Sequence, residues 1–143
     1  MPVTDCDYLF GFNHEQMEKE NLEKFFGVTL KMTSKYHIFD YIGKNIAIEL
    51  KTRRCAKYDY PTTMIPLHKI NRAKRYIKKQ INVFFCFKFN CGNIYYYEYT
   101  DKSDDEIVFK IGGRNDRGQP EYNMYGYIPV DKLDCINTLN LSA

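Results

Sequence analysis

The chain has 143 residues, which is the length of a single folded domain. Hydrophobic residues make up 44% of it and charged residues 27%, which excludes a disordered chain, and no apolar run approaches the roughly 18 residues of a membrane span. The formal net charge of +3 does not by itself indicate any class of partner.

Amino-acid usage is biased toward residues with AT-rich codons. Phe, Tyr, Met, Ile, Asn and Lys fill 67 of the 143 positions, and Trp is absent. We interpret this as the mark of an AT-rich genome, compatible with a phage or a large DNA virus; the alternative is that the aromatic residues stack on bases. The chain begins without a secretory pattern and its five cysteines are scattered. We therefore expect a protein that is not secreted but intracellular, in the host cytoplasm or nucleus if it is viral.

The first half of the chain predicts a helix followed by a hairpin. Residues 14–26 place apolar side chains at helical spacing, with Asn13 as a candidate N-cap. Residues 35–42 and 46–53 alternate between apolar and polar side chains, which predicts two strands joined by a turn around Gly43.

The second half predicts another helix and a series of strands. Residues 66–80 have helical periodicity, and the continuous apolar run 81–89 indicates a strand covered on both faces. Further strands are predicted at 94–100, 107–111 and 125–130. This order indicates one α/β (α+β) domain over residues 1–143. Its core, about residues 13–90, would be a mixed central sheet flanked by two helices, with extra C-terminal antiparallel strands over residues 94–130.

Basic residues are concentrated in the middle of the chain. Residues 44–88 contain twelve Lys and Arg against two acids, Glu49 and Asp59, which is a local net charge of +10. Six of the twelve lie between Lys69 and Lys79, on the second predicted helix. Such a stretch indicates a phosphate-binding surface. The alternative is an ordinary solvated helix face.

Two acids and a lysine come together in the predicted hairpin. Asp40 is on the first strand, and Glu49 and Lys51 are two residues apart on the second, so that their side chains leave one face. If the register places the two carboxylates side by side, they repel each other unless a divalent cation neutralises them. Oxygen ligands of this kind suit Mg²⁺. The alternative is that Glu49 and Lys51 form the solvent face of an amphipathic strand.

The order of helix, strand with Phe39-Asp40, strand with Glu49-Leu50-Lys51, helix and strand resembles the PD-(D/E)XK nuclease superfamily, which has the restriction-endonuclease-like fold. The resemblance covers roughly residues 13–90, with Phe39 in place of the proline. The segments 48–53 and 60–63 are similar to small phage and large DNA virus members.

This resemblance implies a site of known composition. Asp40, Glu49 and the Leu50 carbonyl would hold Mg²⁺ or Mn²⁺, and Lys51 would be the catalytic lysine. A further catalytic Glu would come from the first helix, where we expect Glu15 first and Glu18 second; the alternative is that these acids interact with the helix macrodipole. Candidates for contact with nucleic acid are Arg53, Arg54, Tyr60, Thr62, Lys69, Arg72 and Lys74.

The expected function is therefore a metal-dependent nuclease that hydrolyses phosphodiester bonds in DNA, with no membrane partner. By analogy with the fold, a homodimer would form through the strands after residue 94. One alternative is an inactive module of the same fold that binds nucleic acid or a protein partner, and another is a protein-interaction domain with ordinary surface charges. The run Tyr95–Tyr99 is either a stacking platform or half core.

Overall fold

The computed structural model describes residues 5–34, 36–114 and 121–136, with side chains described for residues 16–34, 36–112 and 123–136. In these residues the chain forms two α-helices and nine strands, arranged in a mixed sheet and a separate antiparallel sheet. The predicted α/β class is thereby confirmed. Neither described helix is long and apolar enough to cross a membrane.

The larger sheet has six strands in the order β1-β2-β3-β5-β6-β9. Strand β3 pairs in parallel with β5, and the other pairs are antiparallel, so the sheet is mixed as predicted. The central position of β5, between β3 and β6, explains why its sequence is an almost continuous apolar run. The bounds are β1 Leu30–Met32, β2 Tyr41–Gly43, β3 Ile46–Thr52, β5 Asn82–Lys88, β6 Ile94–Tyr99 and β9 Asp134–Cys135.

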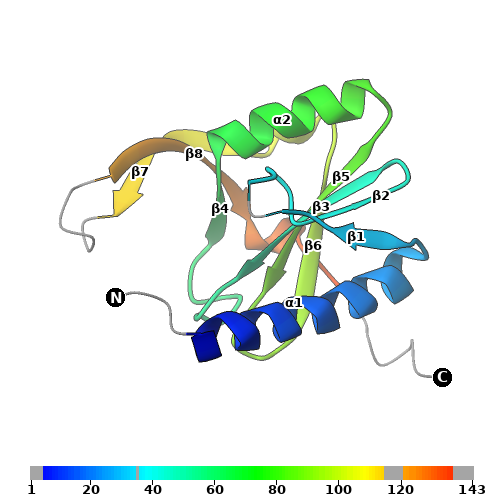
Figure 1. Ribbon diagram of the computed structural model, residues 1–143. Coiled ribbons are helices and arrows are strands. Elements are labelled where there is room, and N and C mark those ends of the chain that lie inside the picture. Colours follow the sequence, from blue (N-terminus) through cyan, green and yellow to red (C-terminus); the bar gives the residue numbers. More distant parts are fainter. Residues whose placement is uncertain (1–4, 35, 115–120, 137–143) are drawn as a thin grey trace.

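Helix α1 (Asp5–Phe26) and helix α2 (Leu67–Lys78) cover opposite faces of this sheet (Figure 1). Leu22 of α1 is buried against Ile48 and Cys86 on one face. Ile70 and Ala73 of α2 are buried on the other face, in the same core as Ala47 and Phe85. The alternation of side chains along β3 thus assigns residues 46, 48 and 50 to the α1 face, and residues 47, 49 and 51 to the α2 face.

A second, three-stranded antiparallel sheet lies beside α2, in the order β4-β8-β7. Strands β7 (Val108–Arg114) and β8 (Glu121–Pro129) are two of the extra C-terminal antiparallel strands predicted over residues 94–130, whereas the first of them, β6, belongs to the larger sheet. Strand β4 (Thr62–Pro66), which was not predicted, joins them from the middle of the chain. A Cβ atom at Gly126 of β8 would lie 2.4 Å from Ile70 Cδ1, so glycine permits the close packing of this sheet against α2.

Two predictions for the first half are wrong. Helix α1 begins at Asp5, so that Asn13 lies inside the helix and is not its N-cap. The predicted strand 35–42 contributes only its end to β2, and Asp40 precedes that strand by one residue. At Phe39 side chains satisfy the backbone, because the Phe39 amide donates to His37 Nδ1 and Thr33 Oγ1 donates to the Phe39 carbonyl.

Other element boundaries also differ from the predicted ones. The short strand β1 was not predicted. Strand β7 continues to Arg114, three residues beyond the predicted strand 107–111, and β8 begins at Glu121, four residues before the predicted strand 125–130. Residues 115–120 between the two strands lie outside the described part of the chain.

The tyrosine-rich strand β6 belongs mainly to the core. Tyr97 and Tyr99 are 5% and 2% exposed, and their hydroxyls donate to Glu106 and Asp104, each at 2.8 Å. Burial raises the pKa of Tyr97 to about 12. Because these two rings are covered by protein, they cannot form the stacking platform that was one of the two interpretations of this run.

Candidate active site

The β2–β3 hairpin holds Asp40 next to Glu49. Strand register pairs Tyr41 with Ile48, and the Asp40 amide continues the ladder by donating to the Ile48 carbonyl at 3.0 Å. The Asp40 carboxylate bends back onto the hairpin, where Oδ2 accepts a 2.8 Å hydrogen bond from the Leu50 amide. The carboxyl group of Asp40 is therefore fixed by backbone from the strand that carries Glu49.

Glu49 is an almost fully buried carboxylate with one unpartnered oxygen. Its residue is 2% exposed. Burial raises its pKa above the ordinary value, and the charge of Asp40 raises the pKa further. Oε1 accepts from Lys69 Nζ at 2.5 Å and lies 3.4 Å from Lys51 Nζ. Oε2 is buried and has no hydrogen-bond partner among the described residues.

Lys69 reaches Glu49 from the first turn of α2. Because Ile70 and Ala73 anchor that helix on the α2 face of the sheet, the neighbouring Lys69 is carried over the same face as Glu49 and Lys51. We refer to Asp40, Glu49, Lys51 and Lys69 as the Glu49 cluster. Desolvation lowers the pKa of His68, and the charges of Lys69 and Lys51 lower it further, so this histidine also lies beside the cluster. Sequence spacing gave no signal for His68.

The oxygen atoms of the Glu49 cluster fit a hard divalent cation. A buried carboxylate oxygen without a partner is costly unless something positive binds it, and Glu49 Oε2 is such an atom. No group of three or more His, Cys, Asp or Glu side chains suitable for a metal occurs in the part of the chain with described side chains. Mg²⁺ and Mn²⁺ remain compatible, since Mg²⁺ commonly binds through one or two carboxylates and keeps several waters.

The acids of α1 are placed differently. Glu15 lies within α1, but its side chain falls outside the described part of the structure. Glu18 is 3% exposed, and its Oε1 lies 2.5 Å from Lys88 Nζ of β5. Glu18 therefore ties α1 to the end of β5 by a buried ion pair.

Arg53 lies between the Glu49 cluster and the second sheet. Its guanidinium donates to the Met64 carbonyl at 2.7 Å and lies 5.7 Å from the centre of the Phe87 ring. Burial lowers the pKa of Arg53. These contacts connect the end of β3 to β4, whereas the next residue, Arg54, is exposed.

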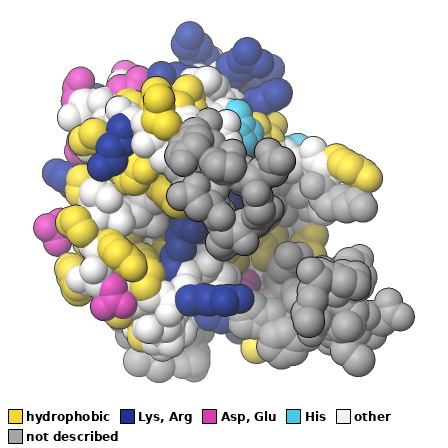
Figure 2. All heavy atoms as spheres, turned by 90° about the vertical axis from the view of Figure 1, so that its left-hand side faces the viewer, with side chains coloured by type: hydrophobic (Ala, Val, Ile, Leu, Met, Phe, Trp, Pro, Cys, Tyr) yellow, Lys and Arg dark blue, Asp and Glu magenta, His cyan; other side chains and the backbone are white. Residues whose placement is uncertain are grey.

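The basic residues of α2 differ in their partners and in their exposure. Lys69 joins the Glu49 cluster, while Lys74 pairs with Asp104 at 2.9 Å and is not part of it. Figure 2 shows Lys and Arg side chains gathered at the top of the molecule, where α2 lies in Figure 1. The exposed basic residues of this helix are Arg72, Arg75 and Lys78.

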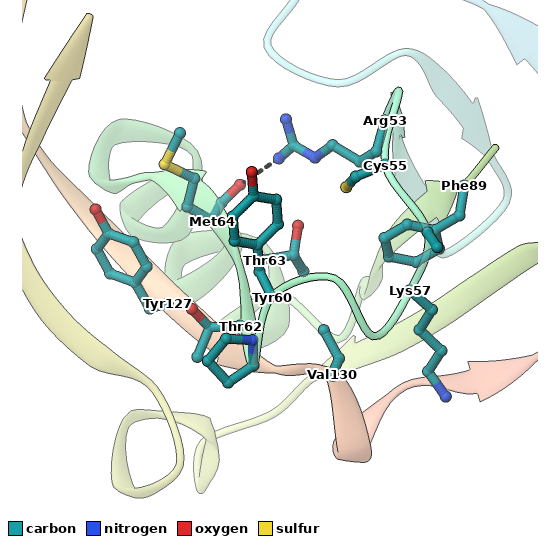
Figure 3. Close-up of a pocket in the computed structure, with 12 residues that line it drawn as sticks. Arg53, Cys55, Lys57, Tyr60, Thr62, Thr63, Met64, Phe89, Tyr127 and Val130 are labelled. Atoms are coloured by element: carbon teal, nitrogen blue, oxygen red, sulfur yellow. Dashed lines mark hydrogen bonds between the residues drawn. The ribbon is translucent and has the colours of Figure 1, made fainter.

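A pocket of about 340 Å³ opens beside Arg53. Tyr60 and Thr62, both expected to contact nucleic acid, are among its lining residues. Figure 3 shows Phe89 and Lys57 on one side of this pocket and Tyr127 on the other, with Tyr60 between them. We call it the β4 pocket, since Thr62, Thr63 and Met64 of β4 form part of its wall. No local sequence pattern predicts the pocket as a whole, because its walls come from distant segments.

The mixed sheet between two helices, with an Asp, a Glu and a Lys on one hairpin, defines a nuclease-type α/β protein of the PD-(D/E)XK superfamily, as the resemblance predicted. A family model described as "phage putative PDDEXK endonuclease" matches residues 12–135. The match covers far more than half of the chain, and the chain belongs to this family. Comparisons with curated proteins and with solved structures each found no match.

Proposed function

We propose that this protein is a nuclease that hydrolyses phosphodiester bonds in DNA and depends on Mg²⁺ or Mn²⁺. The observation that carries the proposal is the buried, unpartnered Oε2 of Glu49 next to the carboxylate of Asp40. Two ionised carboxylates that lie close together in a poorly hydrated place repel each other, and a bound cation relieves this repulsion. Membership of an endonuclease family supports the same conclusion.

Asp40, Glu49 and the Leu50 carbonyl would hold the ion. When bound, the ion would supply Lewis acidity toward a phosphoryl oxygen and a more acidic water for attack on phosphorus. The hydrogen bond from the Leu50 amide to Asp40 Oδ2 keeps this carboxylate oriented. Orientation of this kind limits the reorganisation that the site needs during the reaction.

Lys51 is the residue we assign to the reacting phosphate. Its ammonium lies 3.4 Å from Glu49 Oε1, and its side chain is 32% exposed, so it borders both the acids and the solvent from which DNA approaches. A positive charge there would stabilise the negative charge that develops on the phosphate. Lys69 is 16% exposed and more deeply engaged with Glu49, which favours a role in holding that carboxylate.

The rest of the DNA would be bound by exposed cations around the Glu49 cluster. Arg54, three residues after Lys51, and Arg72, three residues after Lys69, are both exposed and are the main candidates for phosphate contacts. Affinity that depends on such contacts falls steeply with salt, because binding releases counterions from DNA. We expect Lys74 to contribute less to DNA binding, since its ammonium already pairs with Asp104.

A cleavage assay tests the proposal directly. Supercoiled plasmid, linear DNA and RNA are incubated with the protein in Mg²⁺, Mn²⁺ or EDTA, and with the variants Asp40→Asn and Lys51→Met. We expect metal-dependent cleavage of DNA, reduced by a factor of roughly 10² or more in each variant. Asp101→Asn and Lys102→Met are matched controls, because both residues are exposed in the turn after β6. Equal cleavage by all proteins, or cleavage in EDTA, would contradict the proposal.

One observation favours the alternative of an inactive module that binds nucleic acid. Lys69 already pairs with Glu49 Oε1 without any ion, so the buried acid has a reason to persist in a protein that binds no metal. Salt-sensitive DNA binding without cleavage, together with no effect of Mg²⁺ on thermal stability, would support this alternative. Measurement of the mass in solution during the same work tests the expected homodimer.

A further inference from the structure

The β4 pocket is placed close to the Glu49 cluster and is built from a different part of the chain. Arg53 follows Lys51 by two residues, and its amide still pairs with the Lys88 carbonyl of β5, so both side chains leave the α2 face of the sheet. Phe87 connects the two, since it pairs with Lys51 across the sheet and its ring lies 5.7 Å from the Arg53 guanidinium. A strand advances about 3.3 Å per residue, so the pocket begins about 7 Å from Lys51.

The walls of the pocket have the character of a site for a flat aromatic group. Tyr60, Phe89 and Tyr127 provide rings, and Pro61 and Val130 provide further apolar surface (Figure 3). Its volume of about 340 Å³ is at the lower end of the range for pockets that bind small ligands, roughly 300–1,000 Å³. Tyr60 is 63% exposed, so its ring stands at the entrance and is not needed as core.

The charges of the pocket select the class of ligand. Arg53 and Lys57 are among its lining residues, and none of the twelve lining residues is acidic. Thr62 and Thr63 add hydroxyl groups that can donate or accept hydrogen bonds. Aromatic surface, hydrogen-bonding groups and positive charge together complement a nucleobase that is still attached to its phosphates.

We propose that the β4 pocket receives one unstacked nucleobase of the strand whose phosphate lies at the Glu49 cluster. This inference rests on the proposed function and names its substrate class more closely: a strand that is single-stranded, or can be opened, at one position next to the cut. Enzymes that place a base in a pocket must first remove it from the stack, which costs least where pairing is weak or absent. The protein would therefore bind and cut unpaired or distorted DNA in preference to regular duplex.

A coupling experiment between one side chain and one base tests this inference. The probes are single-stranded oligonucleotides in which a single abasic position is moved along the sequence, and affinity is measured with Mg²⁺ in the Lys51→Met background to prevent cleavage. We expect one position at which loss of the base weakens binding roughly tenfold. At that position Tyr60→Ala should cause a similar loss alone but little additional loss on the abasic strand, because both changes remove the same contact.

Two variants keep this test specific. Tyr60→Phe should bind like the parent protein, because the ring and not the hydroxyl stacks on the base. Tyr58→Ala is the matched control, since Tyr58 is 71% exposed in the same loop and is not among the lining residues. Tyr58→Ala should weaken binding equally on intact and abasic strands, or should not weaken it at all. Tyr60→Ala and Tyr58→Ala both replace exposed side chains, so loss of folding would not explain a difference in DNA binding between these two variants.

The outcomes for the pocket and for the nuclease are distinguishable. Independent losses at every abasic position, or equal behaviour of Tyr60→Ala and Tyr58→Ala, would overturn the base pocket, and Mg²⁺-dependent cleavage by the unaltered protein would still uphold the nuclease. Coupling between Tyr60 and one base, together with no cleavage by the unaltered protein, would uphold the pocket and overturn the nuclease. Absence of both binding and cleavage would overturn the two together.

Discussion

Lys69 Nζ lies 2.5 Å from Glu49 Oε1, although the two residues are twenty positions apart and belong to different elements. The lysine lies in the first turn of α2, and the glutamate lies in the middle of β3, with only 2% of its surface exposed. This contact places a positive charge beside one oxygen of the acid, while the other oxygen, Oε2, has no hydrogen-bond partner among the described residues. Lys69 therefore partly supplies the charge that a divalent cation would supply in full.

Removal of Lys69 should make the protein more dependent on a cation. Without metal, Lys69→Met removes a positive charge that pairs with the buried carboxylate of Glu49. We therefore expect a loss of about 1–3 kcal/mol in the free energy of unfolding. Added Mg²⁺ should restore more stability to this variant than it adds to the unaltered protein. Thermal unfolding followed by circular dichroism with and without Mg²⁺ measures both quantities.

Lys74→Met is the control for this prediction. Lys74 belongs to the same helix, but its partner Asp104 is 44% exposed, and such surface pairs contribute only about 0–1 kcal/mol. Its stability should change little and should not respond to Mg²⁺ differently from that of the unaltered protein. Identical behaviour of the two variants would show that Lys69 does not substitute for a cation.

The raised pKa of Glu49 predicts that Glu49→Gln gains stability at neutral pH. A folded-state pKa above the ordinary value of 4.5 means that the folded protein binds this proton more tightly than the unfolded chain does. The contribution of Glu49 to stability therefore decreases as the pH rises from about 4.5 through the folded pKa, by about 1.36 kcal/mol for each unit by which the pKa is raised. The glutamine variant lacks this decrease.

Urea unfolding at several pH values measures the effect. The gain of Glu49→Gln over the unaltered protein should be present at pH 8, disappear below about pH 4 and become smaller at pH 8 when Mg²⁺ stabilises the ionised glutamate. Glu98→Gln, an exposed glutamate of β6, should show no such pattern. A variant that is less stable than the parent protein at pH 8 would contradict the direction assigned to this pKa.

Two adjacent arginines should behave differently. Arg53→Ala removes the hydrogen bond to the Met64 carbonyl and the contact with Phe87, and we expect a loss of about 1–3 kcal/mol in the free energy of unfolding. Arg54→Ala should change stability by less than about 0.5 kcal/mol, because Arg54 is exposed. The same variant should lower DNA affinity and reduce the slope of log affinity against log salt. Chemical unfolding and a salt titration of DNA binding separate these effects.

The buried pair of Glu18 and Lys88 should be important for stability and not for metal binding. Replacement of Glu18 by Leu alone leaves a largely buried lysine, and such changes typically cost about 3–5 kcal/mol. Glu18→Leu combined with Lys88→Met should recover much of this loss, since apolar side chains of similar size can replace a buried ion pair. The Mg²⁺ affinity of the double variant, measured by calorimetry, should equal that of the unaltered protein. Weaker Mg²⁺ binding would instead assign Glu18 to the metal centre.

Local patterns in the sequence were sufficient to predict those helices and strands that present one amphipathic or apolar face. Alternation along β3 assigned Glu49 and Lys51 to one face, and the apolar run of β5 predicted its central place, because period and composition are properties of the segment itself. The segment 36–40 was misread as strand because its alternation resembles one, whereas the side chains of Thr33 and His37 bond the Phe39 backbone and Asp40 continues the ladder.

Tertiary structure alone decided how these elements meet. The charge run of α2 was visible in the sequence, but only the packing of Ile70 and Ala73 on the sheet determines that Lys69 reaches Glu49 while Lys74 reaches Asp104. The β4 pocket needs segments near residues 53–64, 89 and 127–130 to come together, and no local pattern records such distances. The sequence by itself thus determined the superfamily and the residue types of the candidate site, and three-dimensional packing determined which charges pair with one another and where a ligand could enter.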